Sequence, residues 1–402
     1  MRLTLVNQFY APDLSPTAQL AASLSEDRAR RGDQVTVVAG TGGYAARPEP
    51  GQSPSMANPH LYRLWTPSLG RGTALRRLLD YAVFFGQATC RLLALPPQDA
   101  IILMTTPPFL ALAGIMHRLR NRRVRLIVWS MDCYPEALER AGMIRGGGPI
   151  AAALRAINRW LYRRLDSVVC LDDAMRLMLE HAYARGGRPR LVVVPNWESA
   201  ARYPAGSQPR SWEGVGRLEL QGKQVVLYLG NAGAGHRFDT LLQAAQRLPA
   251  SEHAFVFVGG GSAWPDLEAA RDSGRPANLS LEGYVPQDVL PSVLASADAA
   301  LITLRDEMLG VMSPSKLHSA LAMGLPILYI GPPGGNVHEA IERFGCGVSL
   351  RHGDVEGVVG FLSRLRSDPG ARQDYARRSR HAFEAAHTDL VGLASFDSLL
   401  DG

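Results

Sequence analysis

The sequence predicts an α/β protein built from two doubly wound domains. Short apolar stretches alternate with stretches of helical periodicity in both halves of the chain, and turns rich in Gly, Pro or Ser follow the apolar stretches directly. The 402 residues, 46% hydrophobic and 20% charged, suit a globular chain of about two domains. We expect the first domain at residues 1–197, a linker of little periodicity at 198–222, and the second domain at 223–387.

The chain opens with a predicted β-α-β unit. Residues 3–7 form the first strand, residues 17–31 the helix, which Gly32 stops, and residues 34–39 the second strand. Ligands of doubly wound sheets bind at the carboxyl ends of the strands, so the loop at residues 8–16 should border a cleft. The loop lacks the G-x-G-x-x-G pattern of dinucleotide-binding proteins, and we expect no nicotinamide cofactor.

A long amphipathic helix is predicted at residues 75–95. Its apolar side chains fall on one face, and Arg76, Arg77 and Arg91 supply positive charge. Such a helix suits either a membrane interface or the core of an α/β domain with solvated arginines, and the sequence leaves both open. The remaining predicted elements of the first half are strands at 61–65, 125–130, 166–171 and 191–194, a helix capped by Asp172, and a Gly-, Pro- and Ser-rich excursion at 40–60.

Positive charge is concentrated in the first half. The chain has a net charge of +6, but residues 1–200 contain 25 Arg, no Lys and 15 Asp or Glu, a balance of +10 that leaves −4 for the remainder. This asymmetry indicates an anionic partner for the first domain. No recognition motif supports nucleic acid, so we expect peripheral contact with an anionic inner membrane surface or a lipid phosphate. A second basic cluster fits this expectation: Arg118, Arg120, Arg122, Arg123 and Arg125.

We expect the protein in the cytoplasm. No apolar run reaches the ~18 residues needed to cross a bilayer, and the segment MRLTLVNQF is too short and wrongly flanked for a signal peptide. The cysteines are widely spaced and form no Cys-x-x-Cys pair, so neither a zinc site nor a disulfide scaffold is predicted. They are Cys90, Cys133, Cys170 and Cys346.

Two carboxylates follow a predicted buried strand in the segment MDCYPE, residues 131–136. Asp132 and Glu136 would therefore stand at the functional edge of the first sheet, where a general base or a hydroxyl-binding group would be placed. The alternative is an Asp that only forms the turn before Tyr-Pro.

The second half repeats the pattern of a strand followed by a Gly-rich turn. Predicted strands at 225–229, 254–258, 279–282 and 299–303 should end at one edge of a parallel sheet. The turns after the first three read GNAGAGHR, GGGS and GYVP. Such repetition favours close approach of the backbone to a bulky anionic ligand.

The strand at 299–303 leads to the segment GVMSPSKLHSALAMGLPILYIGPPGG, residues 310–335. We predict that Ser313 caps a helix that Pro314 opens, leaving unpaired N–H groups that bind a phosphate together with Ser315 and Lys316. Lys316 is one of only two lysines in a chain with 41 arginines. The alternative is an ordinary capped surface helix with a solvated lysine.

These motifs, in this order, resemble a known family. The segments look like those of a retaining glycosyltransferase of family 4, closest to the branch that builds bacterial exopolysaccharide and O-antigen repeat units. The resemblance covers essentially the whole chain. It rests on NQFYAPDLSPTAQLAASLSEDRARRGDQVTVVAG, VVVPNW, YLGNAGAGHRFDTLLQAA, FVFVGGGS, LEGYVP and SPSKLHSALAMGLPIL.

The resemblance implies a GT-B fold, with an acceptor domain, a nucleotide-sugar domain and a cleft between them. Residues 388–402 would cross back to the first domain. The enzyme would use a nucleotide sugar as co-substrate, a lipid-linked saccharide as acceptor, and neither metal nor cofactor. On the donor side the implied residues are Gly230, Asn231, His236, Arg237, Gly260, Tyr284, Val285, Ser313, Ser315, Lys316 and Leu317, and on the acceptor side Ser15, Thr17, Asp132 and Glu136. Of these, Asp132, Lys316 and Arg237 would be catalytic.

The sequence also departs from the family pattern. Val311 and Ser319 stand where many members carry two glutamates, and Asn231 and His236 replace an Arg and Lys pair, with Arg237 as a substitute cation. The His common after the acceptor-domain strand is missing, which leaves Ser130 or Asp132. A non-catalytic homologue that binds a nucleotide sugar or a partner chain, and a nucleotide-sugar epimerase, remain alternative hypotheses.

Overall fold

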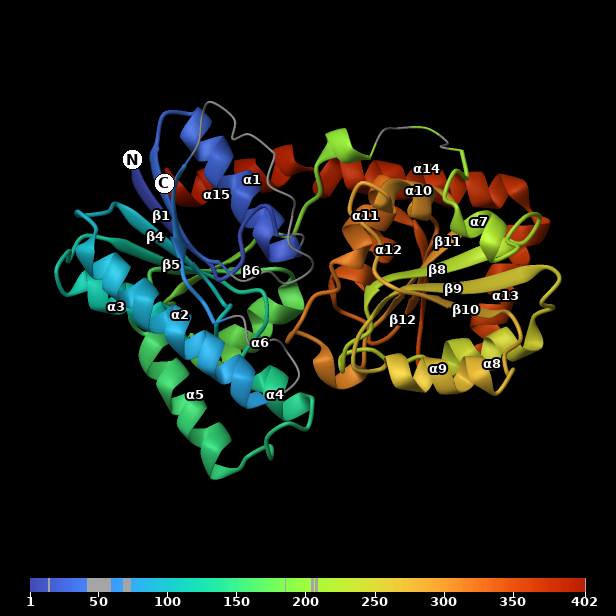
Figure 1. The fold of residues 1–402 in the computed structure, drawn as a ribbon, viewed down its shortest axis with the longest axis horizontal. Helices are drawn as coiled ribbons and strands as arrows, with labels where there is room; N and C mark the ends of the chain where they lie inside the picture. The colour runs from blue at the N-terminus through green and yellow to red at the C-terminus, as the bar shows by residue number, and fades with distance from the viewer. Residues whose placement is uncertain are drawn as a thin grey trace. The chain divides into compact units, whose positions relative to one another are not determined.

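The computed structural model describes residues 1–13, 15–41, 59–67, 74–184, 186–203, 206 and 209–401, and Figure 1 shows the elements they form. The chain divides into two compact units. The first comprises Met1–Val194 together with Leu393–Gly402, and the second Pro195–Gly392. Most of the excursion expected at 40–60 lies outside the described residues, as do four residues of the stretch expected as a linker.

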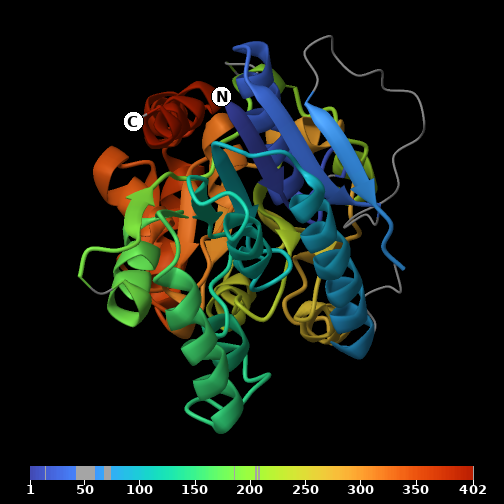
Figure 2. The same ribbon diagram turned by 90° about the vertical axis from the view of Figure 1, so that its left-hand side faces the viewer.

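In the described part of the first unit, seven parallel strands have the order β3-β2-β1-β4-β5-β6-β7. Helices cover both faces of this sheet, as Figure 2 shows. The strands are β1 (Arg2–Val6), β2 (Gln34–Gly40), β3 (His60–Leu64), β4 (Ala100–Met104), β5 (Arg125–Trp129), β6 (Ser167–Cys170) and β7 (Arg190–Val193). The helices are α1 (Pro16–Arg30), α2 (Ala74–Ala94), α3 (Ala111–Arg118), α4 (Glu136–Arg140), α5 (Pro149–Tyr162) and α6 (Asp173–Tyr183).

In the described part of the second unit, six parallel strands have the order β10-β9-β8-β11-β12-β13, the same winding with one strand fewer. The strands are β8 (Gln224–Asn231), β9 (His253–Gly260), β10 (Leu279–Glu282), β11 (Ala299–Thr303), β12 (Ile327–Ile330) and β13 (Gly347–Leu350). The helices are η1 (Ala200–Arg202), α7 (Gly214–Arg217), α8 (Asp239–Arg247), α9 (Trp264–Asp272), α10 (Leu290–Ala295), η2 (Asp306–Met308), α11 (Lys316–Ala322), α12 (Asn336–Phe344), α13 (Val355–Ser367) and α14 (Pro369–Ala386). Helix α15 (Asp389–Leu400) begins in the second unit and ends in the first.

The predicted fold class is confirmed, because both units are parallel sheets wound in both directions from their first strand. The central strands are mostly apolar since helices cover both faces, and every residue of β4, β11 and β12 is buried. The stretch expected as a linker forms η1 and α7 and belongs to the second unit. Strands β4 and β13 and helix α5 were not among the predicted elements.

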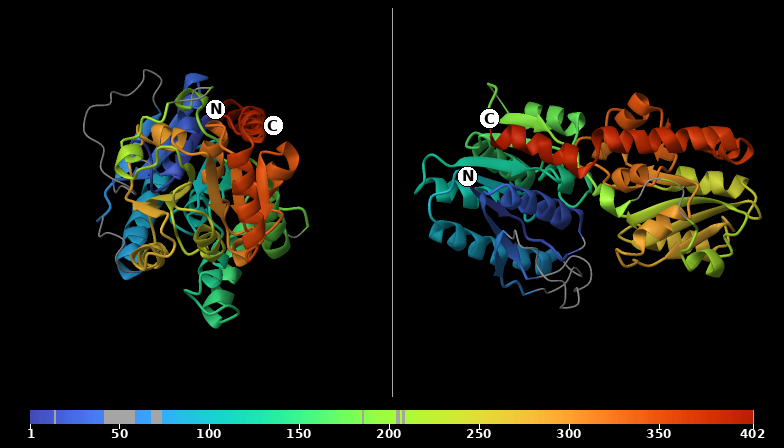
Figure 3. Two further views of the ribbon diagram at one scale, coloured as in Figure 1. Left: turned by 90° about the vertical axis from the view of Figure 1, so that its right-hand side faces the viewer. Right: turned by 90° about the horizontal axis from the view of Figure 1, so that it is seen from above.

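The C-terminal part of α15 packs on the first unit, and Figure 3 shows this red helix beside α1. Arg28 of α1 is 5% exposed and donates to Asp33, Asp397 and Asp401 at 2.6 to 3.0 Å. The rings of Trp129 and Phe396 meet with centroids 4.5 Å apart. A buried cation and a ring contact therefore join this segment to the first sheet.

The structure describes the surroundings of the two features considered for membrane contact. In the second basic cluster, Arg118 bonds Asp166 and main-chain carbonyl oxygens, and Arg120 and Arg125 also donate to carbonyl oxygens. These three arginines therefore link elements of the fold, whereas Arg122 and Arg123 are exposed. In α2, Phe84 is buried in the core, whereas Leu78 and Leu79 are 63% and 46% exposed. No helix among the described residues is both long and apolar enough to span a bilayer.

Candidate functional site

Glycine turns bring β8 and β9 into close contact at the carboxyl edge of the second sheet. Gly259 has a φ of +144°, and a Cβ there would lie 2.2 Å from the carbonyl oxygen of Gly230. Gly261 has a φ of +138°, and its Cβ would lie 2.5 Å from Oδ1 of Asn231. Only glycine fits either position, so the turns leave main chain rather than side chains at this edge.

Lys316 brings α11 to the same edge. Its Nζ lies 3.2 Å from the carbonyl oxygen of Asn231 and 3.2 Å from Nε2 of His236. The ammonium also lies over the Tyr228 ring, 4.7 Å from the ring centroid. The turn after β8 also packs against the segment before α11, because a Cβ at Gly235 would lie 2.3 Å from Sδ of Met312. The fold thus assembles Lys316, His236 and the β8 turn into one group.

The hydrogen bonds of His236 fix its tautomer. Its Nδ1 lies 2.7 Å from the carbonyl oxygen of Thr303, and since a carbonyl only accepts, Nδ1 carries the proton. Nε2 of the neutral ring then accepts from the Lys316 ammonium. Burial, together with the nearby Lys316 charge, lowers the pKa of His236 well below its usual value, which keeps the ring neutral.

Lys316 is a partly desolvated cation that has no carboxylate partner among the described residues. Burial lowers its pKa to about 7, and its neighbours Asn231, His236 and Tyr228 offer dipoles and a ring face instead of a negative charge. An anion placed beside Nζ would replace the lost solvation and favour the charged form. The group is therefore suited to bind a phosphate.

Tyr284 presents an exposed ring beside this edge. The side chain is 63% exposed, and a Cβ at Gly260 would lie 3.0 Å from Cε2 of the ring. The glycine therefore permits the ring to lie against the β9 turn. Val285 follows as a half-buried residue. An exposed aromatic face next to a phosphate-binding group offers a stacking surface for a planar base.

The start of α11 differs from prediction. The helix begins at Lys316, not at Pro314, and neither Ser313 nor Ser315 makes a capping hydrogen bond through its side chain. One reason is that the Pro314 carbonyl accepts from Nδ2 of Asn336, at 3.4 Å, rather than from the helix.

The side chains of Leu317 and Arg237 make contacts outside the Lys316 group. Leu317 is fully buried in the core, so only its main chain could meet a ligand. The Arg237 side chain is exposed and pairs with Asp239, its Nε 2.6 Å from Oδ2. Arg237 thus has an acidic partner, and its role as a substitute cation stays a prediction.

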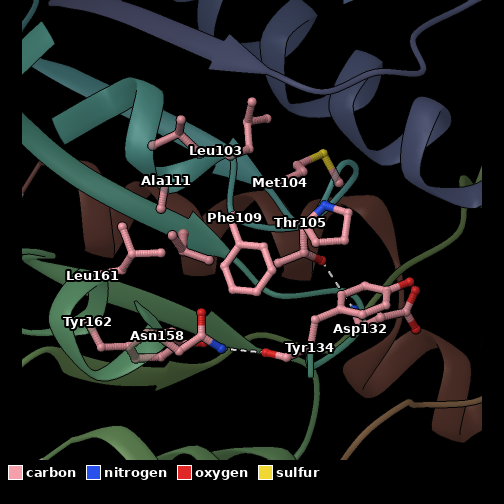
Figure 4. Close-up of a pocket in the computed structure, with 13 residues that line it drawn as sticks. Leu103, Met104, Thr105, Phe109, Ala111, Asp132, Tyr134, Asn158, Leu161 and Tyr162 are labelled. Carbon is pink, nitrogen blue, oxygen red and sulfur yellow. Dashed lines mark hydrogen bonds between the residues drawn. The ribbon is translucent and has the colours of Figure 1, made fainter. Parts of the chain in front are cut away.

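A second candidate lies in the first unit, where Asp132 lines a small cavity (Figure 4). The loop is held by Thr105, whose Oγ1 accepts from the main-chain N–H of Met131 and of Asp132, at 3.0 and 3.2 Å. Asn158 of α5 donates to the Tyr134 carbonyl oxygen. The cavity has a volume of about 40 Å³, and mainly apolar side chains make up the rest of its lining.

Burial changes the acidity of Asp132: loss of solvent raises its pKa to about 6. Glu136 has different contacts. It is 8% exposed, does not line the cavity, accepts from the Tyr183 hydroxyl and lies 3.8 Å from Nε of Arg155. Glu136 thus belongs to a buried network rather than to the cavity.

The remaining acceptor-side candidates are structural in this fold. Ser15 is buried and caps α1, its Oγ accepting from Ala18 N–H at 3.4 Å, and Thr17 contacts Ser15 through the two hydroxyl oxygens at 3.4 Å. Ser130 is 1% exposed and lies 3.6 Å from Sγ of Cys133. Of the two replacements considered for the missing His, Asp132 is the one that lines a cavity.

Two residues that support the Lys316 group were not predicted. Thr303 holds His236 through its carbonyl oxygen, and Tyr228 lies beneath the Lys316 ammonium. The polar Thr at the end of the apolar strand AALIT was a signal for Thr303, whereas Tyr228 reads as an ordinary apolar strand residue. Among the described residues, no group of three His, Cys, Asp or Glu is placed to hold a metal ion.

Comparison with known families assigns these units. Residues 17–197 match the model for the glycosyl transferase 4-like domain, and residues 223–368 match the model for glycosyl transferases group 1. The chain belongs to the family 4 glycosyltransferases. The Lys316 group thus lies in the group 1 domain of the glycosyltransferase, and Asp132 lies in its 4-like domain.

Curated relatives of the glycosyltransferase come from bacteria. The probable glycosyltransferase WbjE of Pseudomonas aeruginosa is 26% identical over 270 residues, which span 67% of this chain and 64% of WbjE, slightly under two thirds of that relative. The putative colanic acid biosynthesis glycosyl transferase WcaI of Escherichia coli is 22% identical over 404 residues, which span 94% of this chain and 96% of WcaI.

Solved structures share the fold of the glycosyltransferase. Sucrose-phosphate synthase from Thermosynechococcus elongatus matches with a TM-score of 0.77 at 13% identity, covering 99% of this chain and 98% of that one. HepE of Anabaena, in complex with UDP-glucose, matches with a TM-score of 0.70 at 14% identity, covering 100% of this chain and 99% of HepE. At these identities the likeness shows the GT-B type of fold alone.

Proposed function

We propose that this glycosyltransferase transfers a sugar, with retention of anomeric configuration, from a nucleoside diphosphate sugar to a lipid-linked saccharide in cell-surface polysaccharide synthesis. The observation that carries the donor half is the Lys316 group: a desolvated ammonium beside glycine turns, with an exposed tyrosine next to them. The names of WbjE and WcaI support the polysaccharide context, and the family resemblance supports retention.

The donor's diphosphate would bind at Lys316. When the bond between the sugar and the diphosphate breaks, negative charge builds on the leaving phosphate oxygens, and a preorganised cation stabilises that charge. His236 holds Nζ toward the glycine turns as a neutral acceptor. Tyr284 would stack on the base. The UDP-glucose complex of HepE supports this class of donor.

Asp132 would act on the acceptor. Its carboxylate, with a pKa raised to about 6, is ionised at neutral pH and can accept a hydrogen bond from the attacking hydroxyl. Because Lys316 supplies positive charge for the leaving group, the reaction as proposed needs no metal ion.

The first unit would bind peripherally to the inner face of the cell membrane. The excess of arginine in residues 1–200 and the exposed Leu78 and Leu79 of α2 support this placement. A lipid-linked acceptor is held at the same surface, so membrane binding would bring enzyme and acceptor together.

The first experiment is a thermal-shift screen with UDP, GDP, dTDP, ADP and their common sugar conjugates. A ligand at a hundredfold excess over its dissociation constant stabilises the fold by about 2.7 kcal/mol, and Lys316→Ala should abolish the shift. Transfer is then measured with the bound donor and membranes that contain the native lipid acceptor. NMR of the product gives its anomeric configuration: retention supports the proposal and inversion contradicts it.

Two results would favour the alternative functions. Conversion of the donor to an isomeric nucleotide sugar without any acceptor would indicate an epimerase. Binding of a nucleotide sugar without turnover, in the presence of the native acceptor, would indicate a non-catalytic homologue. Lys316→Ala should lower turnover by ~10²-fold, the scale for loss of one preorganised electrostatic contact.

A further inference from the structure

Helix α5 has an apolar outward face, although most surface helices are polar there. Its inward side buries Ala151, Asn158, Leu161 and Tyr162. Residues three and four positions apart share a helix side, and the outward side presents exposed Ala152, Ala153, Ala156 and Trp160. Ile150 and Ile157, 64% and 45% exposed, border this face on one side. Figure 2 shows α5 as the green helix that projects from the sheet of its own unit.

On its other side, the face is bordered by two arginines and a groove. Arg159 and Arg163, one turn apart on α5, line a groove of about 260 Å³ together with Ala182 and Tyr183 of α6. The Tyr183 side chain is buried, and its hydroxyl donates to Glu136, so the tyrosine forms a fixed wall. The groove has room for a phosphate group between two guanidinium ions.

These two arginines have no acidic partner among the described residues. Helix α5 contains no carboxylate. The nearby acids are engaged elsewhere: Glu139 of α4 pairs with Arg155, and Glu180 of α6 pairs with Arg176 at 2.9 Å. Arg164 also lies by the apolar face, its guanidinium stacked 3.8 Å from the Trp160 ring centroid. The border therefore carries unneutralised positive charge.

We propose that the groove between α5 and α6 binds the phosphate of an anionic membrane lipid, with the outward face of α5 lying in the headgroup region. An apolar face with a tryptophan next to a row of arginines is the pattern of a helix that lies in a membrane interface. A free phosphate would explain the two guanidinium groups but not the apolar face beside them. This inference rests on the proposed membrane-bound function and names the helix pair and the lipid group that serve it.

The test is sedimentation of the full chain with vesicles of phosphatidylcholine alone or mixed with phosphatidylglycerol. We expect the protein to sediment with the anionic vesicles. The double variant Arg159→Ala/Arg163→Ala should lower the partition coefficient ~30-fold, the factor that corresponds to about 1 kcal/mol for each of two cations. Arg271→Ala/Arg377→Ala is the matched control, because it removes two exposed arginines of the second unit. It should bind vesicles as the wild type does.

A second readout addresses the apolar face. Lipids brominated near the headgroup should quench tryptophan fluorescence in the wild type, and Trp160→Phe should remove that quenching. Three results would overturn the proposal: equal loss of binding in both double variants, no binding of the wild type to anionic vesicles, or a dimer in solution that Trp160→Ser dissociates. Binding of inorganic phosphate that depends on Arg159 and Arg163, without any effect of these residues on vesicle binding, would assign the groove to a free anion and also overturn it.

Failure of this inference can be told from failure of the proposed function. Nucleotide binding, measured by thermal shift, uses residues of the second unit alone and should be the same in Arg159→Ala/Arg163→Ala as in the wild type. Loss of vesicle binding with intact nucleotide binding would support the lipid site. A wild type that transfers sugar to its acceptor but does not bind anionic vesicles would leave the transferase intact and refute the lipid site.

Discussion

Raising the pH should weaken nucleotide binding through Lys316. Burial lowers the pKa of this residue to about 7, so the free enzyme loses its ammonium just above neutrality. Each pH unit above the pKa reduces the protonated fraction about tenfold, and a diphosphate selects the protonated form. The Kd for UDP should rise ~10-fold by about pH 8. It should approach a ~10²-fold rise, the whole contribution of the ammonium, by about pH 9.

Titration calorimetry with UDP at pH values from about 7.5 to 9 measures this effect, since the last ionisation of a phosphate, near pH 6, is complete over that range. Buffers with different ionisation enthalpies report proton uptake, and binding at about pH 8 should take up nearly one proton, because the diphosphate restores the charge on Nζ. Lys316→Arg is the matched control, since a guanidinium stays protonated throughout. Its Kd should change little with pH.

The reasoning fails if wild type and Lys316→Arg show the same dependence on pH, or if UDP binds at about pH 8 without proton uptake. Either result would mean that Lys316 keeps an ordinary pKa or lies away from the diphosphate. His236 is neutral, and its Nδ1–H donates to the Thr303 carbonyl oxygen. It therefore does not titrate in this range and would not mimic the effect.

Three further predictions concern other parts of the chain. Turnover should fall as the pH drops through about 6, where Asp132 becomes protonated. Asp132→Asn should lower kcat by ~10²-fold or more and should abolish this fall. If the variant keeps the fall at acid pH, another group is responsible for it. EDTA should leave the rate of transfer unchanged, whereas loss of activity that Mg²⁺ restores would contradict the proposed role of Lys316. Arg28→Ala should lower the free energy of unfolding by ~2 kcal/mol, because it removes a buried cation that bonds Asp33, Asp397 and Asp401, although the Met1 ammonium still pairs with Asp33 and Arg31 still pairs with Asp397. Denaturant titration with Arg271→Ala as a surface control measures this loss, and equal stability of the two variants would contradict it.

The elements that the sequence predicted well are those with two agreeing signals. β10 and β11 lie where an apolar run is followed by a turn, and their bounds match the prediction. The predicted start of α11 was wrong, because Ser313 and Pro314 are residues that often open a helix when only the local sequence is considered. A distant side chain, Asn336, takes the Pro314 carbonyl instead, and no local pattern reveals such a competitor.

The site shows the same division. Lys316 stood out by its rarity among arginines, and the glycines stood out by their repetition, so both could be found in the sequence. The role of Thr303 depends on its contact with His236 in the turn after β8, and that of Tyr228 on its contact with Lys316 of α11; the residues of each pair are distant in the chain. The partners of Glu136, Tyr183 and Arg155, could not be predicted, because they lie on helices whose packing the sequence does not show.

The position of α15 has a consequence for biosynthesis. The first unit includes Leu393–Gly402, whereas the second is the continuous segment Pro195–Gly392. On the ribosome, the second unit can therefore complete its fold as soon as it emerges. The first unit is translated earlier, but it cannot complete its fold until the whole second unit has been translated. Until then, Arg28 lacks its bond to Asp397, and Trp129 lacks its contact with the Phe396 ring.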